Sequence, residues 1–64
     1  MQQHVKRMLQ ELEDLEGKIK RGTMAHDNPP FGMDSKGREL LGEQLEFMRK
    51  YAEKLKERIA YEEN

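Results

Sequence analysis

Two stretches of the chain carry apolar residues at alternating intervals of three and four, a spacing typical of helices that pack on one another. The first seam consists of Val5, Met8, Leu12, Leu15 and Ile19. The second seam consists of Leu41, Leu45, Met48, Ala52, Leu55 and Ile59. Since a chain of 64 residues forms one domain at most, the two seams predict an all-α fold. The expected structure is an antiparallel two-helix hairpin, a single domain over residues 1–64.

Local residues predict where the first helix ends. Gly22 directly follows the basic pair Lys20 and Arg21. Cations favour the last turn of a helix, and glycine favours the position just beyond it. We therefore expect the first helix to cover about 3–21.

The connection and the second helix are predicted in the same way. Two consecutive prolines exclude a regular helix from the connection, expected over residues 22–33. Asp34 or Ser35 can cap the second helix, which is expected over about 34–61. A connection of this length is long for two antiparallel helices.

The second helix has a wider apolar face than one neighbouring helix covers. A further stripe runs beside its seam and consists of Leu40, Gln44, Phe47, Tyr51 and Arg58. With a shorter first helix, Leu55 and Ile59 would be exposed in a monomer, and their burial would stabilise an oligomer. We therefore expect a homo-oligomer, a dimer or higher. Its expected interface comprises Leu41, Leu45, Phe47, Met48, Ala52, Leu55 and Ile59. The alternative is a marginally stable monomer with a frayed C-terminus.

The sequence contains no recognisable catalytic constellation. The chain has no cysteine, and neither His4 nor His26 has a second ligand at helical spacing. The acidic residues of the second helix lie outside its seam, and the glycines lack the lysine and hydroxyl of a phosphate loop. We expect a protein that is not an enzyme, with no catalytic residues, no metal site and no cofactor.

The charge balance disfavours some partners. Twelve basic and thirteen acidic residues give a net charge of -1, so the overall field attracts neither a nucleic-acid polymer nor an anionic membrane. No apolar run is long enough for a signal peptide or a membrane span. The expected location is therefore the cytoplasm.

Candidate binding residues fall in two regions. In the connection, His26, Asn28 and Phe31 could form a recognition loop held by the prolines. The alternative is that Phe31 and Met33 fold back and cap the open end of the hairpin.

On the second helix the candidates are Gln44, Tyr51, Lys54 and Arg58. Copies of Tyr51, Lys54 and Arg58 from neighbouring chains would form an aromatic and basic pocket suited to a phosphorylated ligand. The alternatives are surface ion pairs for the basic residues, a register-setting hydrogen bond for Gln44 and a core position for Tyr51.

The second helix follows the pattern Leu40-Leu41-x-x-Gln44-x-x-x-Met48-x-x-Tyr51-x-x-x-Leu55-x-x-Arg58-Ile59. This pattern resembles the C-terminal segment of small uncharacterised helical-hairpin proteins of tailed phages and prophages. In those proteins an acidic first helix leads through a loop with a phenylalanine, which Phe31 matches, although the two prolines depart from the pattern. The resemblance implies a location in the host cytoplasm. Small helical phage proteins include counter-defence factors such as anti-CBASS sponges, oligomers that sequester cyclic nucleotides.

Three functional hypotheses follow. The first is a non-catalytic oligomeric binding protein of phage type, a counter-defence factor that sequesters a host signalling nucleotide or effector. The second is a protein–protein inhibitor or adaptor that receives a host helix on its apolar stripe. The third is a structural phage accessory protein. The sequence leaves open the ligand, the number of copies and whether the connection binds a partner or caps the hairpin.

Overall fold

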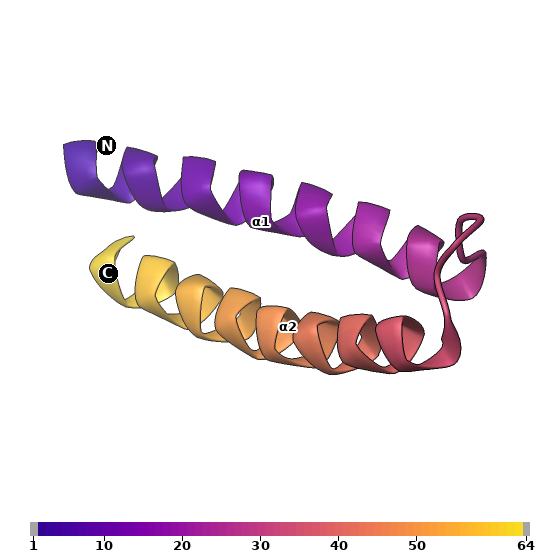
Figure 1. The fold of residues 1–64 in the computed structure, drawn as a ribbon. Coiled ribbons are helices and arrows are strands. Elements are labelled where there is room, and N and C mark those ends of the chain that lie inside the picture. Colours follow the sequence, from indigo (N-terminus) through magenta and orange to yellow (C-terminus); the bar gives the residue numbers. More distant parts are fainter. Residues whose placement is uncertain (1, 64) are drawn as a thin grey trace.

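The computed structural model describes residues 2–63, which form two long antiparallel helices joined by a short loop (Figure 1). Helix α1 spans Gln3–Asp27 and helix α2 spans Ser35–Glu63. The hairpin is elongated, with principal extents of 45 × 15 × 13 Å. The predicted all-α hairpin is confirmed.

The core is the contact between the two predicted seams. Seven hydrophobic side chains are buried there: Val5, Met8, Leu15, Leu45, Ala52, Leu55 and Ile59. Val5 and Met8 of α1 pack with Leu55 and Ile59 of α2 in one cluster. That cluster lies at the open end of the hairpin, where the first turns of α1 lie beside the last turns of α2 (Figure 1).

Helix α1 continues through Gly22 as far as Asp27, so the predicted end at Arg21 is wrong. Gly22 lies three residues after Ile19 and continues the seam of α1 toward the loop. A Cβ atom on Gly22 would lie only 2.6 Å from Cδ2 of Leu45 in α2. The glycine therefore serves the close approach of two helices instead of a left-handed helix end.

The prolines determine where α1 ends. Asn28 precedes Pro29 and adopts φ -128° and ψ 78°, because a proline disfavours the helical conformation of the residue before it. The Asn28 N–H donates the last helical hydrogen bond, to the Met24 carbonyl at 2.9 Å. Helix α1 thus extends as far as the prolines allow.

The loop is shorter than predicted and covers residues 28–34 instead of 22–33. Its turn is closed by the Met33 N–H, which donates to the Pro30 carbonyl at 3.1 Å. Within this turn Gly32 has φ 98°, a conformation that residues with a Cβ atom rarely adopt. The loop has a length that is usual between antiparallel helices.

Asp34 is the residue that caps α2. Its Oδ1 accepts the Gly37 N–H at 2.7 Å, and its carbonyl accepts the Arg38 N–H at 3.0 Å. The first of these bonds satisfies a backbone donor that has no partner inside the helix. The cap confirms one of the two predicted starts, while the helix runs on to Glu63, two residues past the expected end.

The two helices are nearly equal in length, 25 and 29 residues, so α1 extends along most of α2. Leu55 is 0% exposed and Ile59 is 7% exposed in the single chain. The expectation that these two residues are exposed in a monomer is therefore wrong. It rested on the premature end assigned to α1.

Candidate functional site: a groove with a basic rim

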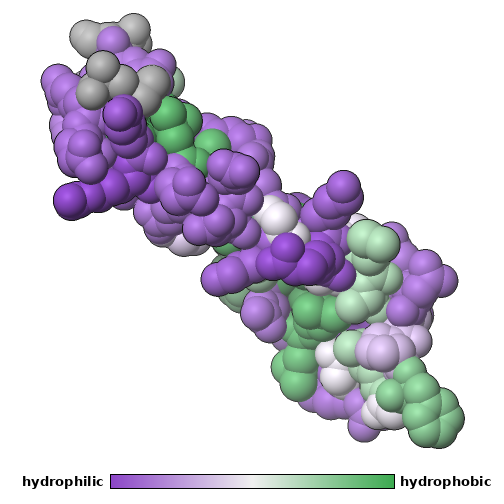
Figure 2. All heavy atoms as spheres, turned by 90° about the horizontal axis from the view of Figure 1, so that it is seen from above, coloured by the Kyte–Doolittle hydropathy of each residue, from purple (hydrophilic) through white to green (hydrophobic). Residues whose placement is uncertain are grey.

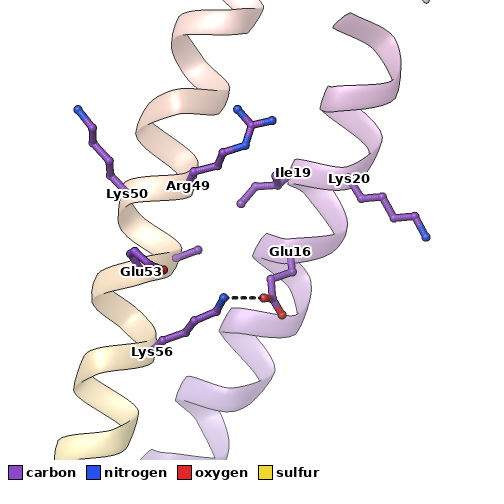
Figure 3. Close-up of a pocket in the computed structure, with 8 residues that line it drawn as sticks. Glu16, Ile19, Lys20, Arg49, Lys50, Glu53 and Lys56 are labelled. Carbon is purple, nitrogen blue, oxygen red and sulfur yellow. Dashed lines mark ion pairs between the residues drawn. The ribbon is translucent and has the colours of Figure 1, made fainter. Parts of the chain in front are cut away.

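An open groove between α1 and α2 has a volume of about 530 Å³. It opens midway along the hairpin (Figure 3). The residues that line the groove are Glu16, Ile19, Lys20, Arg49, Lys50, Ala52, Glu53 and Lys56.

The floor of the groove is apolar because two seam residues form it. Ile19 comes from α1 and Ala52 from α2. Ala52 is buried, and the other buried positions of the α2 seam are leucine or isoleucine. Because alanine has the shorter side chain, space remains beside Ile19. The heptad position that holds a small residue thus creates the groove.

The rim of the groove carries four cations against two carboxylates. Lys56 points across the groove to Glu16, and their Nζ and Oε2 atoms are 3.4 Å apart (Figure 3). Both side chains are about half exposed, so this ion pair contributes little to stability. Lys20 and Lys50 extend outward from their helices (Figure 3).

Arg49 has the most defined position on the rim. Its Nη2 atom donates a hydrogen bond of 2.8 Å to Oγ1 of Thr23 in α1. This bond holds the guanidinium over the gap between the helices, on the side toward which Ile19 points (Figure 3). A planar guanidinium above an apolar floor suits a ligand with both an anionic group and an apolar face.

The residues that line the groove include no serine, cysteine or histidine that could act as a nucleophile or a base. Within residues 2–63, no three histidine, aspartate or glutamate side chains come together as metal ligands would. Neither helix, over the part that the structure describes, is long and apolar enough to cross a membrane. The groove combines an apolar floor with a charged rim.

The model of the Sequestin family matches residues 2–61, nearly the whole chain. The chain belongs to the Sequestin family. Comparison with curated proteins and comparison with solved structures find no match. The name of the family refers to sequestration, which agrees with the expectation of a small binding protein.

In this Sequestin-family chain, His26 takes part in the packing of the loop end. Its ring faces Gly42, where a Cβ atom would lie 3.0 Å from Nε2 of the histidine. Its carbonyl accepts a hydrogen bond of 2.7 Å from Nε of Arg38. These contacts connect the last turn of α1 to the first turns of α2.

The other two candidates in the connection have different surroundings. Asn28 ends α1, whereas Phe31 is fully exposed at the turn. The alternative in which Phe31 folds back over the hairpin is therefore wrong. On the face seen in Figure 2, hydrophobic surface gathers toward the loop end, where Phe31 and Met24 are exposed.

The candidates on α2 do not line the groove; they lie on a face of α2 that is turned away from the groove and is called the outer face below. Gln44 is exposed, so its amide is accessible to water. Tyr51 borders a hollow that it shares with residues of α1, among them Arg7 and Lys18. Lys54 and Arg58 share a separate hollow toward the open end of the hairpin. The structure thus does not bring the predicted site residues together in one chain.

The sequence analysis did not place the cations of the groove together in one site. The sequence shows one basic group near Lys20 and a second one around Arg49, Lys50 and Lys56. Acidic residues interleave both groups, so each is consistent with ordinary surface ion pairs. If the two seams are aligned antiparallel with Ile19 opposite Ala52, the two basic groups fall on the same side of the hairpin. This alignment would have identified the cations of the groove.

Proposed function

We propose that this member of the Sequestin family sequesters a small phosphate-bearing ligand in the groove between α1 and α2. The observation that carries the proposal is the surplus of cations on the groove rim, four against two carboxylates. The whole chain has a net charge of -1, so this surplus is a local concentration of positive charge. Guanidinium and ammonium groups are the usual protein ligands of phosphate.

The apolar floor narrows the class of ligand. Ile19 and Ala52 offer a surface on which a flat, weakly polar group can lie, while Arg49 reaches a phosphate at the rim. A nucleotide combines these two chemical features. Given the resemblance of α2 to phage proteins, we propose that the ligand is a host signalling nucleotide and that binding it counters host defence in the host cytoplasm.

A second position for the ligand is the outer face of α2, around Tyr51, Lys54 and Arg58. The hollow that contains Lys54 and Arg58 is also lined by Glu57 and Glu62, so its charges balance. The rim of the groove has an excess of two positive charges. We therefore favour the groove as the phosphate site.

Calorimetry with a panel of cyclic di- and trinucleotides tests this proposal, with AMP and inorganic phosphate as simpler probes. We expect one panel member to bind, and Arg49→Gln to weaken that binding about 10- to 100-fold, as expected for a lost charged hydrogen bond. Arg58→Gln is the matched control and should bind like the native chain. If only Arg58→Gln loses binding, the site lies on the outer face; no heat from any nucleotide overturns nucleotide sequestration.

The fate of the bound ligand separates sequestration from catalysis. After prolonged incubation the protein is denatured and the released ligand is separated by chromatography. A sequestering protein returns the nucleotide chemically unchanged and in an amount equal to what was bound. Conversion of the nucleotide, absent in the Arg49→Gln variant, would contradict a purely binding role.

A further inference from the structure

A second stripe of α2 remains uncovered in the hairpin. It repeats at alternating intervals of four and three through Leu40, Gln44, Phe47, Tyr51, Lys54, Arg58 and Tyr61. The four exposed large hydrophobic side chains of α2 all belong to it: Leu40 at 51%, Phe47 at 70%, Tyr51 at 46% and Tyr61 at 80% exposed. The spacing is that of a helix face that packs on another helix.

Helix α1 leaves most of this stripe exposed. Its members up to Arg58 each immediately precede a residue of the α2 seam, as Leu40 precedes Leu41 and Tyr51 precedes Ala52. One residue corresponds to a rotation of roughly 100° around a helix axis. The stripe and the seam therefore face different directions, and a second neighbour is needed for the stripe.

The hairpin exposes more surface than a compact chain of the same mass would. The chain exposes 5209 Å², whereas a compact monomer of 7.6 kDa exposes roughly 4,300 Å². The excess of roughly 900 Å² reflects the elongated shape.

We propose that the neighbour is a second copy of this chain, packed α2 against α2 in antiparallel orientation. The dimer axis lies midway between Phe47 and Tyr51, so that Phe47 of each copy packs on Tyr51 of the other. Gln44 then lies opposite Lys54 of the other copy. Leu40 contacts the aliphatic part of Arg58, which covers its exposed side chain.

The charges of α2 favour the antiparallel orientation. Between residues 39 and 46 the charged residues are all acidic: Glu39, Glu43 and Glu46. Between residues 49 and 58 five bases outnumber two acids. An antiparallel pair places the acidic segment of each copy along the basic segment of the other, with Glu43 beside Lys54. A parallel pair would place like charges together.

Dimerisation through the stripe leaves the groove accessible. Of the charged groove residues on α2, Arg49, Glu53 and Lys56 lie on the flank of the seam opposite the stripe, whereas Lys50 stands over Phe47, with Nζ 5.8 Å from the ring centroid. Each dimer therefore presents two grooves, and ligand binding does not require the second copy. The inference is thus independent of the proposed function, and either one can fail without the other.

Sedimentation equilibrium of the native chain at micromolar concentration tests the interface. We expect a mass of about twice the chain mass of 7.6 kDa. Phe47→Lys should weaken association at least about 100-fold, because it places a cation in an apolar contact. Met24→Lys, which changes an apolar residue of α1 that is 61% exposed against 70% for Phe47, is the matched control and should remain dimeric. Circular dichroism confirms that both variants stay helical.

A native chain that is monomeric, or an assembly that survives Phe47→Lys, overturns the proposal. The proposal is also overturned if the native chain is a monomer that binds a host helix and the Phe47→Lys variant does not bind that helix. The stripe would then bind a different protein. Nucleotide binding is compared in Leu40→Lys, a substitution in the same stripe away from the groove, and should match that of the native chain.

Cross-linking tests the orientation, since the chain has no native cysteine. Gln44→Cys and Lys54→Cys chains are prepared separately, mixed and oxidised. The antiparallel dimer predicts a disulfide between the two different chains and none within either preparation alone. Efficient cross-linking of Gln44→Cys with itself would show the parallel orientation and contradict the proposed dimer.

Discussion

Gly22 of α1 packs directly on Leu45 of α2, so closely that a Cβ atom at position 22 would lie 2.6 Å from Cδ2 of the leucine. Leu45 is 3% exposed, and its side chain has little room to move aside. The two residues define the close approach of the helices near the loop. Gly17, one turn and a half earlier in α1, has no such neighbour in α2.

We expect Gly22→Ala to lower the free energy of unfolding by about 1–2 kcal/mol, since overpacking outweighs the helix propensity that alanine adds. The control is Gly17→Ala, whose Cβ would meet only the mobile Arg21 guanidinium, at 3.4 Å. It should raise the same free energy by about 0.5–1 kcal/mol. Urea denaturation of both variants measures the difference, and equal stabilisation by both would contradict the close contact.

Leu55 is the most buried side chain of the seam, at 0% exposure. Leu55→Ala should therefore cost about 2–5 kcal/mol of unfolding free energy, because it removes buried methyl groups and leaves a cavity. In so small a protein this loss would populate the unfolded state. Met24→Ala, at a residue 61% exposed, should change stability by less than about 0.5 kcal/mol. Thermal unfolding followed by circular dichroism compares the two.

The start of α2 depends on the Asp34 carboxylate, which accepts the Gly37 N–H at 2.7 Å. We expect Asp34→Ala to destabilise the protein by about 1 kcal/mol, the usual loss for a helix cap. Ser35 lies at the first helical position, so Ser35→Ala should stay within about 0.5 kcal/mol of the native chain. Chemical denaturation measures the stability of both variants. A larger loss for Ser35→Ala would show that Ser35, and not Asp34, caps α2.

A substitution at Lys56 distinguishes an effect on stability from an effect on ligand binding. Its ion pair with Glu16 is half exposed, so Lys56→Gln should change the free energy of unfolding by less than about 1 kcal/mol. The same substitution removes one of the four rim cations and should weaken phosphate-bearing ligands about 10-fold. Denaturation and calorimetry on one preparation give both values. A large stability loss would show that any binding defect reflects folding.

Much of the fold could be predicted from the local sequence pattern. Because the two seams obey the helical period, they predicted both helices and the faces that meet, and Asp34 was one of two predicted caps. The end of α1 was not readable, because a glycine after two cations resembles a helix end. The seam itself held the missing signal, since Gly22 and His26 continue the spacing of Leu15 and Ile19.

The candidate site was less accessible to sequence reasoning. The predicted residues His26, Asn28 and Phe31 lie at the loop, far along the chain from Lys54 and Arg58. The groove instead combines Lys20 with cations of α2, and its depth depends on the short side chain of Ala52. Because residues of both helices form the groove, the sequence pattern of either helix alone does not predict it.

Helical periodicity predicts the two amphipathic helices and the second stripe on α2, because it is a property of local residue spacing. The role of Gly22 and the grouping of the cations around one groove depend on how the two helices pack. The same glycine suits a helix end or a close helix contact, and the presence of Leu45 across the interface distinguishes the two. Opposite helices contribute the rim of the groove, so its charge arises only when the hairpin closes.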